Sequence, residues 1–219
     1  MAIQIEFIKS NPYFFGLSPA ELDSIRGRIF EIKADRGGTI LFEGESADAL
    51  YIVVSGVIKV FKTSADGKEQ ILQIVRPGES FNEVSVFDEG PNLASAQAMG
   101  PVVLYGIRKG DLEVILRNQP KIALNVIRVL AQKLRHLVSL VEDLSFKHVT
   151  ARLAKILLEY ASDGTGSRQR LTQQEMAAMA GTAREIIGRS LKALEDEGTI
   201  RMERHRIIIV DKEALKEKA

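Results

Sequence analysis

The pattern of hydrophobic and polar positions divides the chain into three regions. In the first region, residues 11–36 are predicted to be helical. Ser18, Pro19 and Glu21 form a helix start signal, because Ser18 can cap a helix, Pro19 suits its first position and Glu21 can reach back as a capping box. The strand-like part of the chain is therefore expected to begin only after this helical region.

From about residue 37 the apolar residues recur with a period of two. Short runs rich in β-branched side chains are separated by glycine and proline turns, and these runs are GGTILF, ALYIVV, GVIKVFKT, EQILQIV and VVLYGI. Asp66-Gly67 between two of the runs is a strong hairpin signal. Regular short strands with such turns predict an antiparallel sandwich or barrel-like roll that can enclose a small cavity.

A long helix is predicted to follow the strands. Pro120 marks its start, and no helix-breaking residue follows before residue 148. Along this helix apolar residues repeat at alternating intervals of three and four, which makes a continuous seam. The seam comprises Ile127, Leu130, Leu134, Leu137, Val141 and Leu144. The seam can pack against the chain's own strands or against a second copy, and the strict repeat favours a coiled-coil homodimer.

The last region, residues 149–219, carries two helix start signals in succession. Thr172 and Glu175 have the spacing of a capping box and predict one short helix. Gly181 then supplies a tight turn, and Thr182 is placed to cap a second helix. Two short helices joined through a glycine turn predict a helix-turn-helix unit.

The second of these helices has a polar face suited to DNA. Its apolar face, which is expected to be buried, comprises Ile187, Leu191 and Leu194. Arg184, Glu185 and Arg189 are candidate base-reading residues, because arginine fits the O6/N7 edge of guanine and glutamate accepts from the cytosine amino group. Gly188 lies on the flank, where a missing side chain would allow close backbone approach. In the alternative interpretation Glu185 is only a capping residue, or forms a surface ion pair with Arg189.

A basic segment follows the second helix. TIRMERHRIIIV predicts two strands joined by a charged turn, a wing whose Arg201, Arg204, His205 and Arg206 can contact phosphates. The candidate contacts to the DNA backbone are Thr172, Gln173, Thr182, Arg204 and His205.

Composition narrows the classes of protein and site. The chain of 219 residues has no cysteine, which excludes disulfides, thiolate zinc sites and cysteine-held iron–sulfur clusters. Its net charge of +1 neither supports nor excludes nucleic acid as a partner. No apolar run is long enough for a membrane span and no signal peptide is evident, so a cytoplasmic location with no membrane partner is expected. No catalytic motif is present, and an enzyme is not expected.

Two long segments resemble the family of the catabolite activator protein and the fumarate–nitrate reduction regulator. They are TQQEMAAMAGTAREIIGRSLKALEDEG and GGTILFEGESADALYIVVSGVIKVF, and the resemblance extends over nearly the whole chain. It implies an α+β fold with a cyclic-nucleotide-binding-type β-roll that senses an effector (1–120), a dimerisation helix (121–148) and a winged helix-turn-helix domain that binds DNA (149–219). It also implies a homodimer on a palindromic double-stranded operator with TGTGA-like half-sites, and RNA polymerase as a partner, contacted in some members by the loop matching residues 162–170.

The chain departs from the cyclic-AMP-binding members of this family at the effector site. Where those members carry an Arg-Ser pair that holds the cyclic phosphate, this sequence has Leu93 and Ala94, although Glu83 of the preceding pair is kept. The positions that contact adenine are matched by Leu137 and Val138, which neither donate nor accept hydrogen bonds. These five residues predict an apolar effector pocket, and cyclic AMP is not expected as the ligand because a phosphate diester buried without a cation is costly.

The segment NEVSVFDEGPNLASAQA is most similar to the nitric-oxide-responsive branch of the family, which uses haem. Haem is therefore one candidate effector, with His136 as a candidate axial ligand, and an apolar organic molecule or plain core are the alternatives. Two other functions stay open beside an effector-controlled regulator. One is a cyclic-nucleotide-binding regulatory protein that acts on a protein partner, and the other is a DNA-binding regulator that needs no effector.

Overall fold

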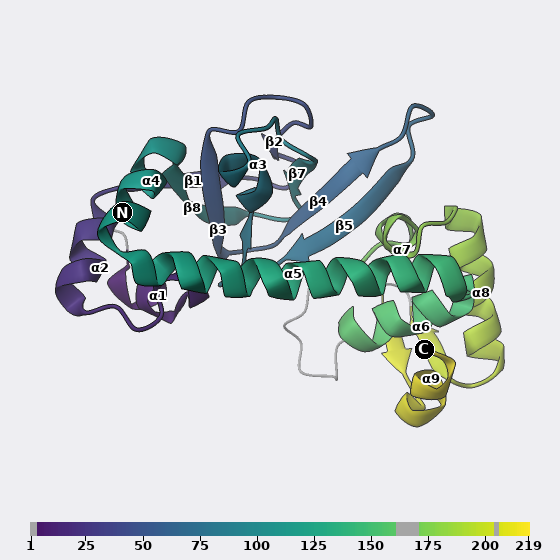
Figure 1. The fold of residues 1–219 in the computed structure, drawn as a ribbon. Helices are drawn as coiled ribbons and strands as arrows, with labels where there is room; N and C mark the ends of the chain where they lie inside the picture. The colour runs from purple at the N-terminus through teal and green to yellow at the C-terminus, as the bar shows by residue number, and fades with distance from the viewer. Residues whose placement is uncertain (1–3, 161–170, 204–205) are drawn as a thin grey trace. The chain divides into compact units, whose positions relative to one another are not determined.

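The computed structural model describes residues 4–160, 171–203 and 206–219 of the chain. These form two compact units (Figure 1). The first unit combines residues 1–62 with 72–136, and the second combines residues 63–71 with 137–219. Arg204, His205 and the polar loop 162–170, all singled out in the sequence, lie outside the described residues. Each unit has its own hydrophobic core, so each is described by itself.

Three short helical elements open the first unit: α1 (Ile5–Ser10), the 3-10 helix η1 (Pro12–Phe14) and α2 (Pro19–Arg26). The predicted capping box of α2 is confirmed, since the Ser18 side chain accepts from the Glu21 N–H and the Glu21 carboxylate accepts from the Ser18 N–H at 2.6 Å. The prediction of helix as far as residue 36 is wrong, because Ile29–Ala34 form strand β1. Gly27 ends α2, and the segment after it pairs along its whole length with a neighbouring strand.

Two four-stranded sheets make the predicted antiparallel roll. One has the order β1-β8-β3-β6 and the other β2-β7-β4-β5. The strands other than β1 are β2 (Thr39–Leu41), β3 (Ala49–Ser55), β4 (Ile58–Thr63), β5 (Glu69–Val75), β6 (Ser80–Phe81), β7 (Ser95–Ala98) and β8 (Val102–Arg108). The two sheets share one core, in which Val53, Ile58 and Leu104 are fully buried. The predicted hairpin is confirmed: β4 neighbours β5, and the Ser64 N–H donates to the Lys68 carbonyl at 2.9 Å across the turn.

Three helices complete the first unit: α3 (Glu83–Phe87), α4 (Lys109–Asn118) and the part of α5 (Pro120–Phe146) that precedes residue 137. This part of α5 packs on the roll through Ile122 and Val126, and Leu130 is half-buried against the same core. The Asn125 amide donates to the carbonyls of Tyr13 and Phe15 at 3.0 and 3.1 Å, which fixes the helix to the N-terminal turns. Leu130, expected in the exposed seam, is therefore shared with the roll.

The second unit contains the helices and strands that follow α5. They are α6 (Val149–Tyr160), α7 (Gln173–Ala180), α8 (Arg184–Asp196), β9 (Ile200–Glu203), β10 (Arg206–Ile209) and α9 (Lys212–Lys218). Leu153, Leu194 and Leu215 are completely buried in their common core, and each comes from a different helix. Among the described residues, no helix is both long and apolar enough to cross a membrane.

Candidate functional site

The predicted helix-turn-helix is present at α7 and α8. The side chain of Thr172 accepts from the Glu175 N–H at 3.1 Å, and the Glu175 carboxylate accepts from the Thr172 N–H at 2.6 Å, so the capping box that starts α7 is confirmed. Gly181 ends α7 with φ +63°. This left-handed backbone conformation favours glycine, and a Cβ atom added there would also lie 2.7 Å from Cδ2 of Leu144, whose side chain would have to move.

The predicted cap of the second helix is wrong. Ala183 is the N-cap of α8, and no side chain caps it. Thr182 instead continues the turn, where its N–H donates to the Ala177 carbonyl at 3.0 Å. Helix α8 begins at Arg184, one residue later than a Thr182 cap requires. Glu185 therefore has no capping-box role, which removes one of the two structural alternatives to base reading.

The two faces of α8 differ as the sequence predicts. Ile187, Leu191 and Leu194 are buried in the core of the second unit. Glu185 and Arg189 are exposed on the other side, and Arg184 is exposed at the flank of the first turn. Within the residues that the structure describes, no ion pair joins Glu185 to Arg189. The face carries two guanidinium groups and one carboxylate, which can donate to and accept from base edges in a major groove.

The wing is present as the antiparallel pair β9 and β10. It is held to α8 by the N–H of Met202, which donates to Oε1 of Glu195 at 2.7 Å. Arg201 and Arg206 are exposed on its strands, and Arg201 pairs with Glu203 at 3.7 Å. Among the other predicted backbone contacts, Thr172 is exposed at the start of α7, and Gln173 and Thr182 are half-buried.

The roll carries a buried polar network that was not predicted. Glu83, at the start of α3, is only 4% exposed. Its Oε1 accepts from the Tyr13 hydroxyl and from Nζ of Lys133, both at 2.8 Å. The Ser80 hydroxyl donates to the Tyr13 oxygen at 2.8 Å, and the Lys133 ammonium also donates to the Ser80 carbonyl. Burial and the nearby Glu83 carboxylate raise the pKa of Tyr13, so the phenol stays a neutral donor. The network joins α5 to the roll.

The residues of the predicted effector pocket differ from one another in burial. Leu93 is 51% exposed. Its N–H donates to the Ser85 hydroxyl at 3.2 Å and its carbonyl accepts from Lys62. These two hydrogen bonds fix the main chain with the Leu93 side chain pointing outward. Ala94 is buried. The surroundings of Glu83 are charged rather than apolar. Leu137 and Val138 are exposed and belong to the second unit.

Lys133 was not predicted as a site residue, although its spacing along α5 indicates a position on the buried face. It follows Ile122, Val126 and Val129 at intervals of three and four, so it lies on the face of α5 that packs on the roll. A lysine on a buried helical face calls for a carboxylate partner. For Tyr13, no local pattern indicates that it meets Glu83, 70 positions further along the chain.

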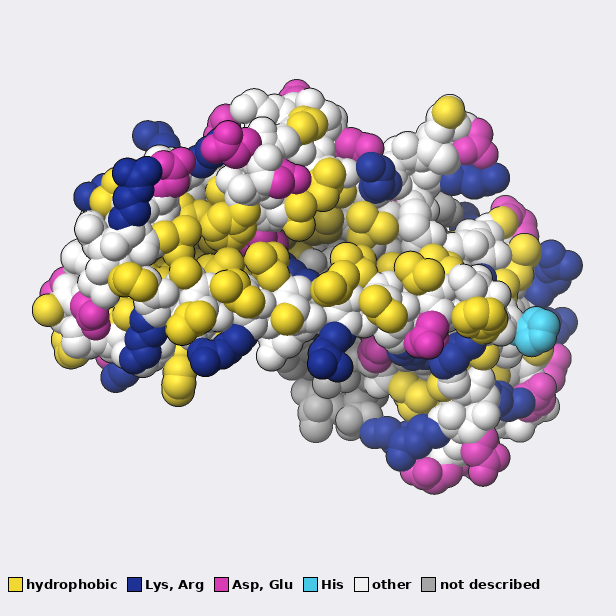
Figure 2. All heavy atoms as spheres, in the orientation of Figure 1, with side chains coloured by type: hydrophobic (Ala, Val, Ile, Leu, Met, Phe, Trp, Pro, Cys, Tyr) yellow, Lys and Arg dark blue, Asp and Glu magenta, His cyan; other side chains and the backbone are white. Residues whose placement is uncertain are grey.

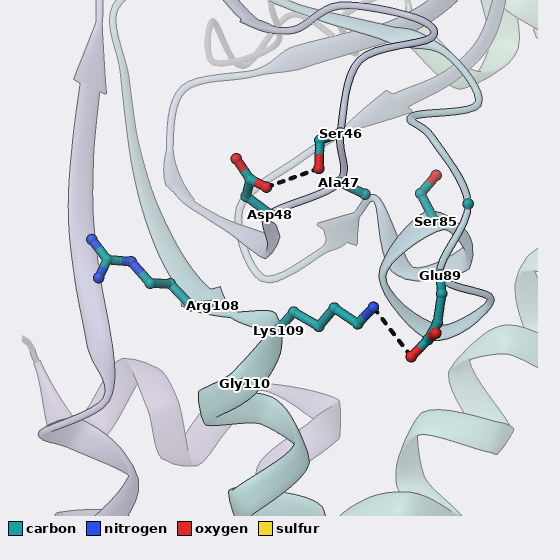
Figure 3. A pocket seen from close by; sticks show the side chains of 9 residues that line it. Ser46, Ala47, Asp48, Ser85, Glu89, Arg108, Lys109 and Gly110 are labelled. Atoms are coloured by element: carbon teal, nitrogen blue, oxygen red, sulfur yellow. Dashed lines mark hydrogen bonds and ion pairs between the residues drawn. The ribbon is translucent and has the colours of Figure 1, made fainter.

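A cavity of about 450 Å³ opens elsewhere on the roll (Figure 3). Its charged side chains are largely paired: Lys109 lies 3.2 Å from Glu89, and Asp48 accepts from the Ser46 hydroxyl at 3.1 Å. Arg108 extends away from these pairs and lies over the Phe30 ring. Glu83, Leu93 and Ala94 do not line the cavity, but Ser85, which accepts from the Leu93 N–H, does.

Neither His136 nor His148 lines the cavity described above. His136 and His148 are both exposed, His136 on α5 and His148 just after it. The cavity described above is lined by polar and charged side chains rather than by the apolar ones that a porphyrin requires. The third histidine, His205, lies outside the described residues.

Lys133→Met is expected to destabilise the protein by about 3 kcal/mol, because it leaves the buried Glu83 carboxylate without its cation. This expected loss of stability lies at the lower end of the range for a buried ion pair, because the Lys133 side chain is 22% exposed. The double variant Lys133→Met/Glu83→Gln should recover most of this loss, because the remaining amide is neutral. The free energy of unfolding in urea measures both effects.

The matched control is Arg117→Met, which breaks the exposed pair with Glu113 on α4 in the same unit. This variant should change the free energy of unfolding by less than about 0.5 kcal/mol. Equal losses for Lys133→Met and the double variant would mean that Lys133 contributes packing rather than charge.

Two family models match the chain. A cyclic nucleotide-binding domain matches residues 31–119, and a Crp-like helix-turn-helix domain matches residues 151–218. Together they cover the roll and the helix-turn-helix formed by α7 and α8.

Named relatives match along most of their length. The cyclic AMP receptor protein of Thermus thermophilus is 35% identical over 195 residues, which are 89% of this chain and 90% of that protein. The CRP-like cAMP-activated global transcriptional regulator of Mycobacterium tuberculosis is 33% identical over 213 residues, 94% of this chain and 95% of the relative. Among solved structures, the Thermus thermophilus catabolite activator protein is 34% identical with a TM-score of 0.57, and the match covers 95% of this chain and 98% of that one.

Proposed function

The chain belongs to the Crp–Fnr family of DNA-binding transcription regulators, and we propose that it acts as a homodimer that reads a two-fold symmetric operator through α8. The observation that carries the proposal is the exposed Arg184, Glu185 and Arg189 on a helix whose opposite face is buried in the core. In this proposal residues 1–120 sense the effector, residues 121–148 form the dimer helix and residues 149–219 bind DNA.

The exposed apolar side of α5 supports the homodimer. Figure 2 shows hydrophobic side chains gathered along this helix. The exposed members are Leu124, Ile127, Leu134, Leu137, Val138, Val141 and Leu144. A contiguous apolar stripe on a monomer marks an interaction surface, and a repeat of three and four residues along one helix suits a second copy of the same helix. Five of the six predicted seam residues are in the stripe, and Leu130 is half-buried at its edge.

The chemistry of α8 supports an operator with G·C pairs in each half-site. Arginine donates in pairs to guanine, and glutamate accepts from cytosine. We extend this to TGTGA-like half-sites because Arg184, Glu185 and Arg189 match the family's reading positions. Relatives often carry threonine at the position of Ile186, which lies beside these three residues. The base next to the TGTGA-like core is therefore not assigned. RNA polymerase as the protein partner rests on the family alone.

We further propose that cyclic AMP is not the effector, in contrast to the two relatives whose names refer to it. Leu93 and Ala94 offer no cation or hydroxyl to a cyclic phosphate. Glu83, the one kept polar residue, already accepts from Tyr13 and Lys133. The same network favours a second candidate, a regulator that needs no effector, since it ties α5 to the roll with the chain's own side chains.

Arg189→Ala is expected to weaken operator binding by roughly fivefold to a hundredfold and to relax selection at one G·C pair, because it removes a paired donor to guanine. Selection from random DNA with wild type and variant, followed by titration of the selected sites, measures both effects. Arg206→Ala on the wing is the control: it should weaken all sequences alike and lower the salt dependence of binding. A selected motif without G·C preference in its half-site would contradict this assignment of α8.

A further inference from the structure

The last part of α5 carries a buried carboxylate that has no role in the seam. Asp143 is 8% exposed, although the next residue, Leu144, is 38% exposed. Oδ2 of Asp143 accepts from Nζ of Lys155 on α6, and its Oδ1 lies 3.3 Å from Nζ of Lys147. Lys155 also donates to the hydroxyl of Ser139 on α5, at 3.2 Å. Asp143 and Lys155 therefore join α5 to α6 through a largely buried ion pair.

The Asp143 carboxyl is ionised in this setting. Burial by itself raises its pKa, but hydrogen bonds and charge from Lys155 and Lys147 outweigh burial and hold the pKa below its usual value. A buried ion pair adds little net stability compared with apolar residues of similar size, because taking the charges out of water costs about as much as their attraction returns. Such a pair can instead favour one arrangement of the two helices that carry it.

Arg152, also on α6, extends the same junction to the helix-turn-helix. Its Nε donates to the carbonyl of Ala180, the last residue of α7, at 2.8 Å. Its Nη1 donates to the carbonyl of Lys147, the residue after α5, at 2.5 Å. Leu144, the last residue of the predicted seam, lies so close to Gly181 that a Cβ atom added there would be 2.7 Å from its Cδ2. The end of the seam, α6 and the turn before α8 are thus joined within the second unit.

We propose that Asp143 is a positioning residue: through Lys155 it sets the angle between the dimer helix and the helix-turn-helix, and so the separation of the two α8 helices in a dimer. This inference rests on the proposed homodimer that reads DNA through α8. The half-sites of such dimers lie about one turn of DNA apart, and one base pair changes their separation by about 3.4 Å. A fixed junction therefore makes operator binding sensitive to the number of base pairs between the half-sites.

The test is Asp143→Asn, which keeps the size of the side chain and removes its charge. The variant is titrated with the selected operator, with the same operator lengthened by one base pair between the half-sites, and with a single half-site. On the selected operator it should lose affinity roughly threefold to thirtyfold, as for a residue that couples two sites. On the lengthened operator it should lose less, so that the preference for one spacing falls. Its affinity for the single half-site should equal that of the wild type, because α8 is unchanged.

Lys155→Gln should reproduce this pattern from the other side of the pair. The double variant Asp143→Asn/Lys155→Gln should lose no more affinity than either single variant, because both changes break the same interaction. Glu197→Gln is the matched control, since it breaks an exposed ion pair with Lys218 that also lies within the second unit. It should leave the affinities for all three duplexes unchanged.

Two results would overturn the inference. An equal loss on all three duplexes would show that Asp143 supports the fold of the second unit and not its orientation. Wild-type affinity together with wild-type spacing preference in Asp143→Asn would show that the pair positions nothing.

Arg189→Ala, measured on the single half-site, separates this inference from the proposed function. If Arg189→Ala weakens half-site binding and Asp143→Asn leaves the spacing preference intact, α8 reads DNA but Asp143 does not position it. If Arg189→Ala binds the half-site as the wild type does, the assignment of α8 itself is wrong.

Discussion

Replacing Leu134 and Leu137 together with aspartate is expected to yield a folded monomer that no longer binds its operator. The two side chains are 63% and 44% exposed in the single chain, so the substitution removes little packing within it. In a dimer joined along α5 the same change places four carboxylates in one apolar seam. Each buried carboxylate costs several kcal/mol or must take up a proton, which is enough to dissociate most helical dimers.

Sedimentation equilibrium and operator titration of the Leu134→Asp/Leu137→Asp variant measure the two losses separately. Phe42→Asp is the matched control, because Phe42 is also a large exposed apolar residue, but it lies outside α5, just after β2. The control should sediment as wild type. A Leu134→Asp/Leu137→Asp variant that sediments as a dimer and binds operator normally would contradict the coiled-coil interpretation of the seam.

The sequence predicted best the features that depend on neighbouring residues. The capping boxes at Ser18 and Thr172 and the turn at Gly181 each involve residues at most four apart, so their signals can be read locally. The hairpin at Asp66-Gly67 is of the same kind. The Thr182 cap had the right residue types but was wrong, because Gly181 already closes the turn and α8 begins only after Ala183.

The features that the sequence could not supply depend on distant partners. Strand β1 was taken for helix because its partner, β8, lies about 70 positions further along the chain and imposes the extended conformation. Strands β6 and β7 are short, and the only apolar residue that alternates in β7 is alanine, so both give a weak strand signal. The network of Tyr13, Glu83 and Lys133 joins three separate parts of the chain. For this reason the surroundings of Glu83 were expected to be apolar and are charged.

Cyclic AMP is expected to bind two to four orders of magnitude more weakly than to a site with the complete family set of contacts. A lost charge-assisted contact to the phosphate costs about 1.5–3 kcal/mol, and two lost partners of adenine cost about 1 kcal/mol each, where 1.4 kcal/mol is about tenfold. Lys133 reduces the repulsion between Glu83 and a phosphate, but it is already held by Glu83 and Ser80. Oε1 of Glu83 already accepts from the Tyr13 hydroxyl, so a ribose hydroxyl at this oxygen would compete with it.

Calorimetry with cyclic AMP and cyclic GMP tests this expectation on the wild-type protein, and operator titration with each nucleotide shows whether binding has an effect. Leu93→Arg/Ala94→Ser should restore measurable affinity for cyclic AMP, because Leu93 is exposed and its main chain is fixed by Ser85 and Lys62, so an arginine fits without displacing core. Leu93→Gln/Ala94→Ser is the control, since it adds polarity without charge and should restore far less affinity. Micromolar binding of cyclic AMP by the wild type, coupled to tighter operator binding, would refute the prediction and make cyclic AMP the effector.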